Sequence, residues 1–386
     1  MAKVTTSTLG DLAILPYQAQ APLTEALEFL TDVMEAYDGS EQRLQLRTMP
    51  RQTFQYTIPV KFWNIAESFN TAYNAIRKKW AIPLWTEAQF VGDVTAHATD
   101  ITCNTSLYDL RASSLAFLFN AAGAWQVVEI STKTSTKINA ANDLSYIASA
   151  WLMPIRIGWI VGDVKKSTNA YEDMVEINFF VDDNLDLTPS APTQYLSNDI
   201  YFDSPVLSGS NMDKSLQQRA DIVDQVLGVV SRRSPWLNAR YASTYRSVLQ
   251  GAQQVRDYKA FLYRRAGKFR SFWMPTFEQN MRHANTGTIL STLTIEADSY
   301  AQYPQRQHIA IESASGVWYP RAVSNPTPVA GNRIQLTLDS ALNLDASKVR
   351  RISYLGLHRL NTDKIELRWI GNNVVESEFG ILEISP

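Results

Sequence analysis

The sequence predicts an α+β protein, mainly β, that is built from two tandem copies of one unit. Three observations lead to this prediction: short alternating apolar runs between turn residues, stretches with helical periodicity, and landmarks that recur at a nearly constant interval. Each copy is expected to contain a strand–helix module followed by a small antiparallel β barrel or sandwich.

Five landmarks recur in the same order in both halves. Pro275 of "WMPTF" follows Pro83 of "AIPLW" by 192 positions (275 − 83). Gly316 of "GVWYPRAV" follows Gly123 of "GAWQVVEI" by 193 positions (316 − 123). "TLTIE" matches "DITCN", "RIQ" matches "KIN", and "ELRWI" matches "EINFF". The preserved order and spacing indicate an internal duplication.

The first module of copy one is expected to be a strand followed by a helix. Phe54, Tyr56 and Ile58 alternate with polar residues, which is typical of a half-buried strand. The following stretch, 62–80, carries apolar residues at helical spacing. An amphipathic helix is therefore expected there.

The first module of copy two repeats this pattern. We expect "YASTYRSVL" (241–249) to form the strand and 253–267 to form the helix, with Gly267 capping its C-terminus. Pro83 and Pro275 then stop the helices and force the chain into an extended course.

Composition divides the chain into six segments. These are an N-terminal arm (1–24), a strand–helix module (25–90) and a β-rich domain (91–187) of copy one, a linker (188–215), and a strand–helix module (216–285) and a β-rich domain (286–386) of copy two. The linker is rich in Pro, Ser, Asn and Asp, but its tyrosines and leucines favour an ordered segment.

Charge and cysteine content exclude several classes of protein. The formal charge of −2 and the pI of about 6.1 provide no basic field for sequence-specific nucleic-acid binding. Cys103 is the only cysteine, which excludes an intrachain disulfide and a cysteine-based zinc site. No segment approaches the roughly 20 apolar residues of a membrane helix, and no signal peptide is apparent. We expect a protein that folds in a reducing cytosol without membrane contact.

The sequence contains little that is typical of an active site. His97, His283, His308 and His358 do not form a metal-binding spacing, and phosphate-binding, dinucleotide-binding and nucleophile-elbow motifs are absent. The acidic loop from Asp182 resembles a calcium loop at alternate positions but lacks its glycine and its final glutamate. We therefore expect no enzyme activity, no cofactor and no metal.

Two groups of residues are candidates for contacts between subunits. Arg43, Arg47 and Arg51 recur at every fourth position, either as a charged helix face or as a stripe that pairs with an acidic neighbour across an interface. If the stripe lies at an interface, Arg47→Glu should disrupt assembly while the monomer stays folded. Aromatic residues at the two proline corners either pack within the subunit or contact another one; they are Trp80, Trp85, Phe272, Trp273 and Phe277.

Two stretches resemble tail-tip proteins of long-tailed bacteriophages. In "FLTDVMEAYDGSEQRLQLRTMPRQTFQY" (29–56), an acidic turn and an arginine precede a Pro-Arg pair and an aromatic strand. "YKAFLYRRAGKFRSFWMPTFEQN" (258–280) has a helix, a glycine and then Phe-Trp-x-Pro-Thr. Both are similar to distal tail, or upper baseplate, proteins, and clear similarity covers about a third of the chain.

The resemblance implies a structural virion protein that is not an enzyme. Its modules would form a homo-oligomeric ring at the distal end of the tail tube, as a trimer that gives a pseudo-hexamer or as a hexamer. The β-rich parts would contact other baseplate proteins or fibres, and the arm and the linker would lie across adjacent subunits. The protein would assemble in the host cytoplasm and end up in the tail of the virion.

An alternative function is carbohydrate binding or depolymerisation at a surface. Trp125, Trp318 and Trp369 in the β-rich parts are candidates for stacking on sugars. Two of them lie at landmarks of the duplication, which favours a role in the fold.

Overall fold

The computed structural model describes residues 3–6, 10–60, 72–73, 75, 77–168, 173–184, 189, 191–206, 213–224, 226–236, 238–299 and 306–384. Strands account for 56% of the residues, so the prediction of a mainly β protein is confirmed.

The elements follow one another along the chain in two comparable series. The N-terminal half contains β1 (Lys3–Thr6), β2 (Gly10–Ile14), β3 (Gln20–Glu28), β4 (Thr31–Glu35), β5 (Glu41–Gln45), β6 (Arg51–Val60), β7 (Trp80–Pro83), the 3-10 helix η1 (Trp85–Glu87), β8 (Gln89–Val94), β9 (Asp100–Thr102), β10 (Ser114–Phe119), β11 (Trp125–Lys133), β12 (Lys137–Ala140), β13 (Ile147–Ile160), β14 (Lys165–Thr168) and β15 (Asp173–Val181). The C-terminal half contains β16 (Gln194–Tyr195), β17 (Asn198–Ile200), β18 (Lys214–Gln217), β19 (Asp221–Val223), β20 (Ser231–Arg233), β21 (Arg240–Gln250), α2 (Ala252–Arg265), β22 (Phe272–Pro275), β23 (Thr288–Ile289), β24 (Thr292–Glu296), η2 (Ala297–Ser299), β25 (His308–Ser313), β26 (Trp318–Val329), β27 (Arg333–Leu338), β28 (Leu344–Asp345), η4 (Ala346–Lys348), β29 (Val349–Leu360), β30 (Lys364–Gly371) and β31 (Val374–Glu383).

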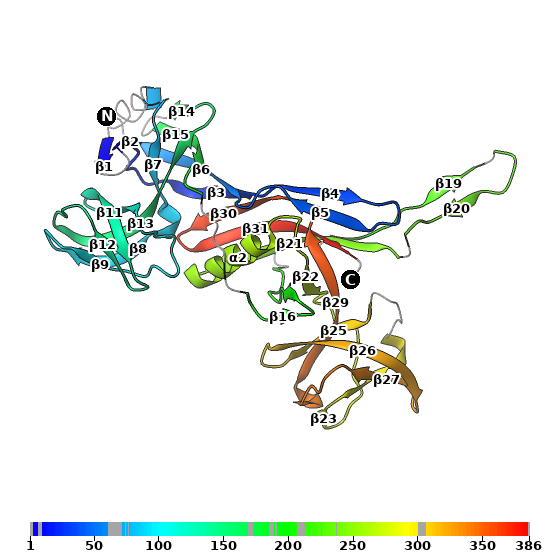
Figure 1. The fold of residues 1–386 in the computed structure, drawn as a ribbon. Helices are drawn as coiled ribbons and strands as arrows, with labels where there is room; N and C mark the ends of the chain where they lie inside the picture. Colours follow the sequence, from blue (N-terminus) through cyan, green and yellow to red (C-terminus); the bar gives the residue numbers. More distant parts are fainter. Residues whose placement is uncertain are drawn as a thin grey trace.

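A continuous antiparallel sheet runs through the centre of the molecule. Its strands follow the order β14–β15–β6–β3–β30–β31–β21–β18. Since β3 belongs to the N-terminal half and β30 to the C-terminal half, both halves share this sheet, as Figure 1 shows. The helix α2 packs on it through Val255, Tyr258 and Leu262, which are buried in the central core.

Local sequence patterns explain the main elements of this sheet. In β6, alternate residues including Phe54, Tyr56 and Ile58 are buried, as the alternation predicts. The predicted strand at 241–249 lies within β21, and the predicted helix of copy two matches α2. The helix ends where Ala266 and Gly267 adopt left-handed backbone conformations, with φ of 50° and 68°.

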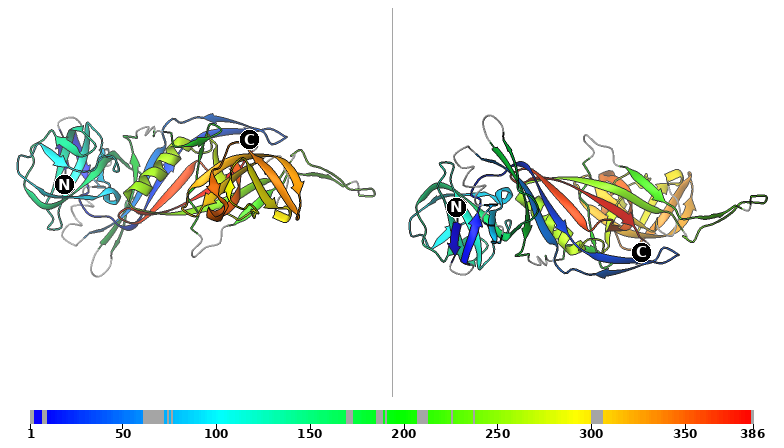
Figure 2. Two further views of the ribbon diagram at one scale, coloured as in Figure 1. Left: turned by 90° about the horizontal axis from the view of Figure 1, so that it is seen from below. Right: turned by 90° about the horizontal axis from the view of Figure 1, so that it is seen from above.

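Two long strands carry the chain from the separate β-rich part of each half back to the central sheet. β13 pairs with β8 and β10 over its first part and with β7 and β15 over its last part. β29 likewise pairs first with β25 and then with β22 and β31. These β-rich parts have their own apolar cores and lie at separate places along the molecule (Figures 1 and 2).

The strand pairings of the two halves match one another. In the N-terminal half, β6 pairs with β15, β15 with β13, and β13 with β7. In the C-terminal half, β21 pairs with β31, β31 with β29, and β29 with β22. The parallel pair of β2 with β7 corresponds to that of β17 with β22. Outside the sheet, the series β9–β12–β11–β10–β13 corresponds to β24–β27–β26–β25–β29.

Three sequence predictions need correction. The β-rich parts are open sheets and not closed barrels; β9, for example, has three residues, and β8 and β9 pair with other strands but not with each other. Two strand–helix modules are not supported, because α2 is the one α-helix whose bounds lie in the described ranges, and most of 62–80 falls outside them. "EINFF" lies on β15 and "ELRWI" on β30, whereas the pairings make β31 the counterpart of β15. Adjacent strands with the same alternation cannot be told apart by pattern alone.

Candidate functional site

Strands β3 and β30 join the two halves through backbone pairing and an apolar seam. Leu27 lies directly opposite Ile365, and both side chains are fully buried. Just beyond β3, the N–H of Phe29 donates to the carbonyl of Asp363 at 2.9 Å. The ring of Phe29 meets that of Tyr263 edge-on, with 6.1 Å between centroids. The core of the sheet is therefore common to both halves.

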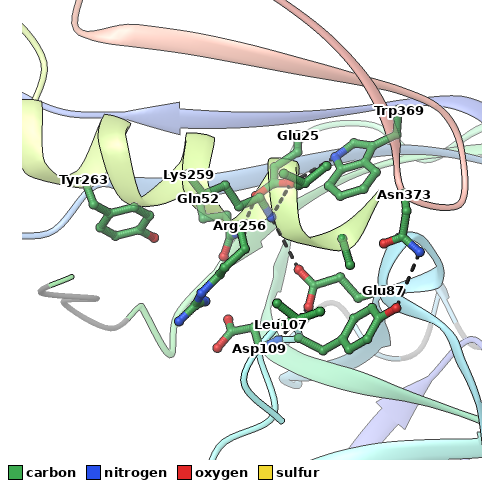
Figure 3. Close-up of a pocket in the computed structure, with 13 residues that line it drawn as sticks. Glu25, Gln52, Glu87, Leu107, Asp109, Arg256, Lys259, Tyr263, Trp369 and Asn373 are labelled. Atoms are coloured by element: carbon green, nitrogen blue, oxygen red, sulfur yellow. Dashed lines mark hydrogen bonds and ion pairs between the residues drawn. The ribbon is translucent and has the colours of Figure 1, made fainter. Parts of the chain in front are cut away.

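A buried ionic network lies at this joint (Figure 3). The ammonium of Lys259 on α2 is 3.0 Å from Oε2 of Glu25 on β3 and 3.4 Å from Oε1 of Glu87 in η1. Glu25 also accepts hydrogen bonds from the amide of Gln52 at 2.6 Å and from the indole N–H of Trp369 at 3.0 Å. The network thus connects β3, β6 and η1 of the first half with α2 and β30 of the second.

The charges in this network support one another. Burial alone disfavours the ammonium of Lys259, but Glu25 and Glu87 outweigh this effect and raise its pKa above the ordinary value. The ammonium also lies 5.1 Å from the ring centroid of Trp369, a cation–π contact. Lys259 therefore remains charged throughout the neutral range.

A second ionic group adjoins the first. The carboxylate of Asp109 accepts two hydrogen bonds from Arg111, at 2.9 and 2.7 Å, and contacts the fully buried Arg156. Burial opposes the charge of Asp109, but Arg156 and Arg111 hold its pKa well below the usual range. The backbone N–H of Asp109 donates to Oε2 of Glu87 at 2.7 Å, which links the two groups.

The first of these ionic groups joins the two halves, and the second, which lies within the N-terminal half, is linked to it through Glu87. Catalytic acids and bases usually have a pKa that is shifted toward neutrality. The pKa of Asp109 and that of Lys259 are both shifted away from neutrality. Within the described ranges, no group of three His, Cys, Asp or Glu side chains is arranged to hold a metal ion.

The three arginines of the predicted stripe lie along the second strand of the β4–β5 hairpin, the connection after it and the start of β6. Arg43 lies on β5 and Arg51 begins β6, so the helix-face interpretation is wrong. Arg47 lies in the connection between these two strands, so the three arginines do not share one strand face. The guanidinium of Arg43 donates to the carbonyl of Lys268 at 3.4 Å, and that of Arg47 donates to the carbonyl of Glu28 at 2.7 Å. Their role between subunits stays a prediction.

The aromatic residues at the proline corners contact their own chain. Trp80 on β7 and Phe272 on β22 are buried at matching places in the central core. Trp273 is buried in a smaller cluster, while Trp85 and Phe277 are partly buried against neighbouring clusters. Packing within the subunit thus accounts for the burial of Trp80, Phe272 and Trp273.

The three tryptophans that are candidates for stacking on sugars have different surroundings. Trp369 is buried within the ionic network and offers no face to a ligand. Trp125 is 39% exposed and stacks on Phe117, with 5.7 Å between centroids. Trp318, in the C-terminal half, stacks on Phe202, with 5.5 Å between ring centroids.

Two hairpins extend from the central sheet at matching places. They are β4–β5, between β3 and β6, and β19–β20, between β18 and β21. The hydroxyl of Tyr37 in the first hairpin bonds to Asp221 in the second. At the base of the second hairpin, Arg240 lies 3.3 Å from both Glu35 and Glu41. Figures 1 and 2 show that β19–β20 projects well beyond the rest of the molecule.

The tip of the second hairpin is apolar and exposed. Val226, Leu227 and Val229 are 88%, 99% and 87% exposed. Exposed apolar clusters of this kind typically mark sites of contact with other molecules. The apolar run in "DQVLGVV" (224–230) is the signal in the sequence that indicates this tip.

Comparison of the sequence with known protein families and with curated proteins finds no match. Within the described residues, no helix is both long enough and apolar enough to cross a membrane.

Proposed function

We propose that this protein is a structural subunit of a ring-shaped assembly at the tail tip, or baseplate, of a long-tailed bacteriophage. In this proposal the ring joins the distal end of the tail tube to other baseplate proteins or fibres. The protein acts through its surfaces and not through catalysis.

The observation that carries this proposal is the repeated pairing pattern within one continuous sheet. Two units with matching strand pairings lie side by side and are joined through β3 and β30. We interpret them as two descendants of one ancestral unit. Neighbours in a ring have the same relationship, and closed rings are common among homo-oligomers. A trimer would present six such units, and a hexamer twelve.

The projecting hairpin gives further support. An apolar tip that is almost fully exposed in one chain is readily explained if another protein covers it in the assembly. Its position at the end of a long hairpin allows contact with a component outside the ring, such as the tail tube.

The mass of the purified protein in solution tests this proposal. We expect three or six times the 43.5 kDa of one chain, together with ring-shaped particles in negative-stain images. A protein that stays monomeric at the highest soluble concentration, with or without tail-tube protein, would contradict it. Binding to a glycan array or cleavage of a polysaccharide would favour the carbohydrate alternative.

A further inference from the structure

We propose that β18 of one copy pairs with β14 of a second copy and so reproduces between subunits the β3–β30 joint that exists within the chain. β14 and β18 are the two outer strands of the central sheet. Within the described ranges, β14 pairs with β15 and β18 with β21, and no other strand pairs with either. This inference rests on the proposed ring and names the surface through which its subunits join.

The register of the strands makes β18 the counterpart of β3. Glu28 of β3 lies opposite Arg51 of β6, and Gln217 of β18 lies opposite Arg240 of β21. Both residues of the second pair follow those of the first by 189 positions (217 − 28 and 240 − 51). By the same count, Leu216 is the counterpart of Leu27.

The register also makes β14 the counterpart of β30. β14 and β30 occupy the same place beside β15 and β31. Counting along these pairs makes Lys165 the counterpart of Glu366 and Val164 that of Ile365. Within the chain, Leu27 lies directly opposite Ile365. The proposed joint therefore places Leu216 of one copy opposite Val164 of the next.

The burial of these residues shows what a second copy would cover. Leu27 and Ile365 lie opposite each other in the joint within the chain, and both are fully buried in the central core. Their counterparts are not covered: Leu216 is 63% exposed and Val164 is partly buried. Pairing of the two outer strands would bury this leucine and this valine in the same way.

A pocket beside β14 offers a place for the incoming leucine. Trp80, Trp159, Ile160 and Val164 contribute to its lining, and its volume is about 230 Å³. That volume exceeds the roughly 150 Å³ of a cavity known to hold a benzene molecule, so a leucine side chain fits.

The charges along the proposed joint are compatible with pairing. Lys214 of β18 would lie opposite Lys166 of β14, and like charges in this position are unfavourable on their own. Each lysine already has an acidic partner, Glu278 for the first and Asp173 at 2.8 Å for the second. These carboxylates compensate the two positive charges.

Disulfide trapping tests the register directly. In a Cys103→Ala background, protein with Leu216→Cys is mixed with protein that carries Val164→Cys, and the mixture is oxidised mildly. We expect a covalent dimer on a non-reducing gel, because opposite residues of an antiparallel pair have Cβ atoms about 5 Å apart. Neither protein alone should give this product. A matched control uses Leu290→Cys, which is 53% exposed and outside the joint, in place of Leu216→Cys.

A charge substitution tests the energetic role of the same leucine. Leu216→Asp should leave the unfolding midpoint of the monomer unchanged but raise the concentration at half-assembly by about tenfold or more. Leu290→Asp should leave assembly unchanged. If wild-type rings form but the introduced thiols do not cross-link, or if Leu216→Asp assembles normally, the joint is wrong while the proposed function survives. If the wild type never assembles, both fail.

Discussion

Removing the ammonium of Lys259 should destabilise the protein strongly. In the Lys259→Met variant, the carboxylates of Glu25 and Glu87 lose the cation that lies 3.0 and 3.4 Å away. Breaking a buried ion pair by removing one partner costs about 3–5 kcal/mol. Glu25 keeps its hydrogen bonds from Gln52 and Trp369, so we expect the lower end, about 3 kcal/mol.

Urea unfolding followed by tryptophan fluorescence measures this loss. The matched control is Lys348→Met, because Lys348 is exposed and its replacement should change stability by less than about 0.5 kcal/mol. Adding Glu25→Gln to Lys259→Met removes the buried charge that has lost its main partner, so part of the loss should be recovered. If Lys259→Met and Lys348→Met unfold at the same urea concentration, the network does not hold the joint as we argue.

Three further predictions follow from the described residues. Gly158→Ala should lower the free energy of unfolding by more than about 2 kcal/mol, because a Cβ there would overlap a backbone carbonyl of β15. A Cβ at Gly371 would meet nothing within 4 Å, so Gly371→Ala should be nearly neutral in the same urea assay. Burial lowers the pKa of His358 from 6.5 to about 4, so between these pH values the unfolded chain binds a proton that the folded chain does not. The free energy of unfolding should therefore be highest above pH 6.5 and fall by up to about 3 kcal/mol toward pH 4. The His358→Gln variant should show a flatter dependence on pH. Replacing Leu227 and Val229 by serine should leave the urea midpoint within about 0.5 kcal/mol but weaken co-sedimentation with the tail tube, and unchanged co-sedimentation would argue against the tip as a contact.

Local sequence patterns predicted the strands and the helix in which buried side chains recur at a regular spacing. The alternation of Phe54, Tyr56 and Ile58 predicted β6, and the helical spacing of Val255 and Leu262 predicted α2. These predictions succeeded because each element buries one face against the central core, and the sequence period reports which residues lie on that face.

The sequence does not reveal the joint between the halves, because alternation identifies a strand but not its neighbour. The ionic network was missed for a similar reason, since its members come from several elements. One signal was available: Lys259 lies between Tyr258 and Leu262 on the buried face of the helix. A lysine at such a position needs a buried carboxylate, but the helix alone does not show that Glu25 and Glu87 supply it.

The pairing of β3 with β30 also has a consequence for biosynthesis. Glu25 and Trp369, which meet in the finished molecule, are 344 positions apart in the chain. At about 5–20 residues per second, the ribosome needs on the order of tens of seconds to supply the second strand after the first has emerged. During that time β3 has no partner on one side, and an open strand edge invites aggregation. A polypeptide released prematurely would never acquire β30, so it could not complete the central sheet.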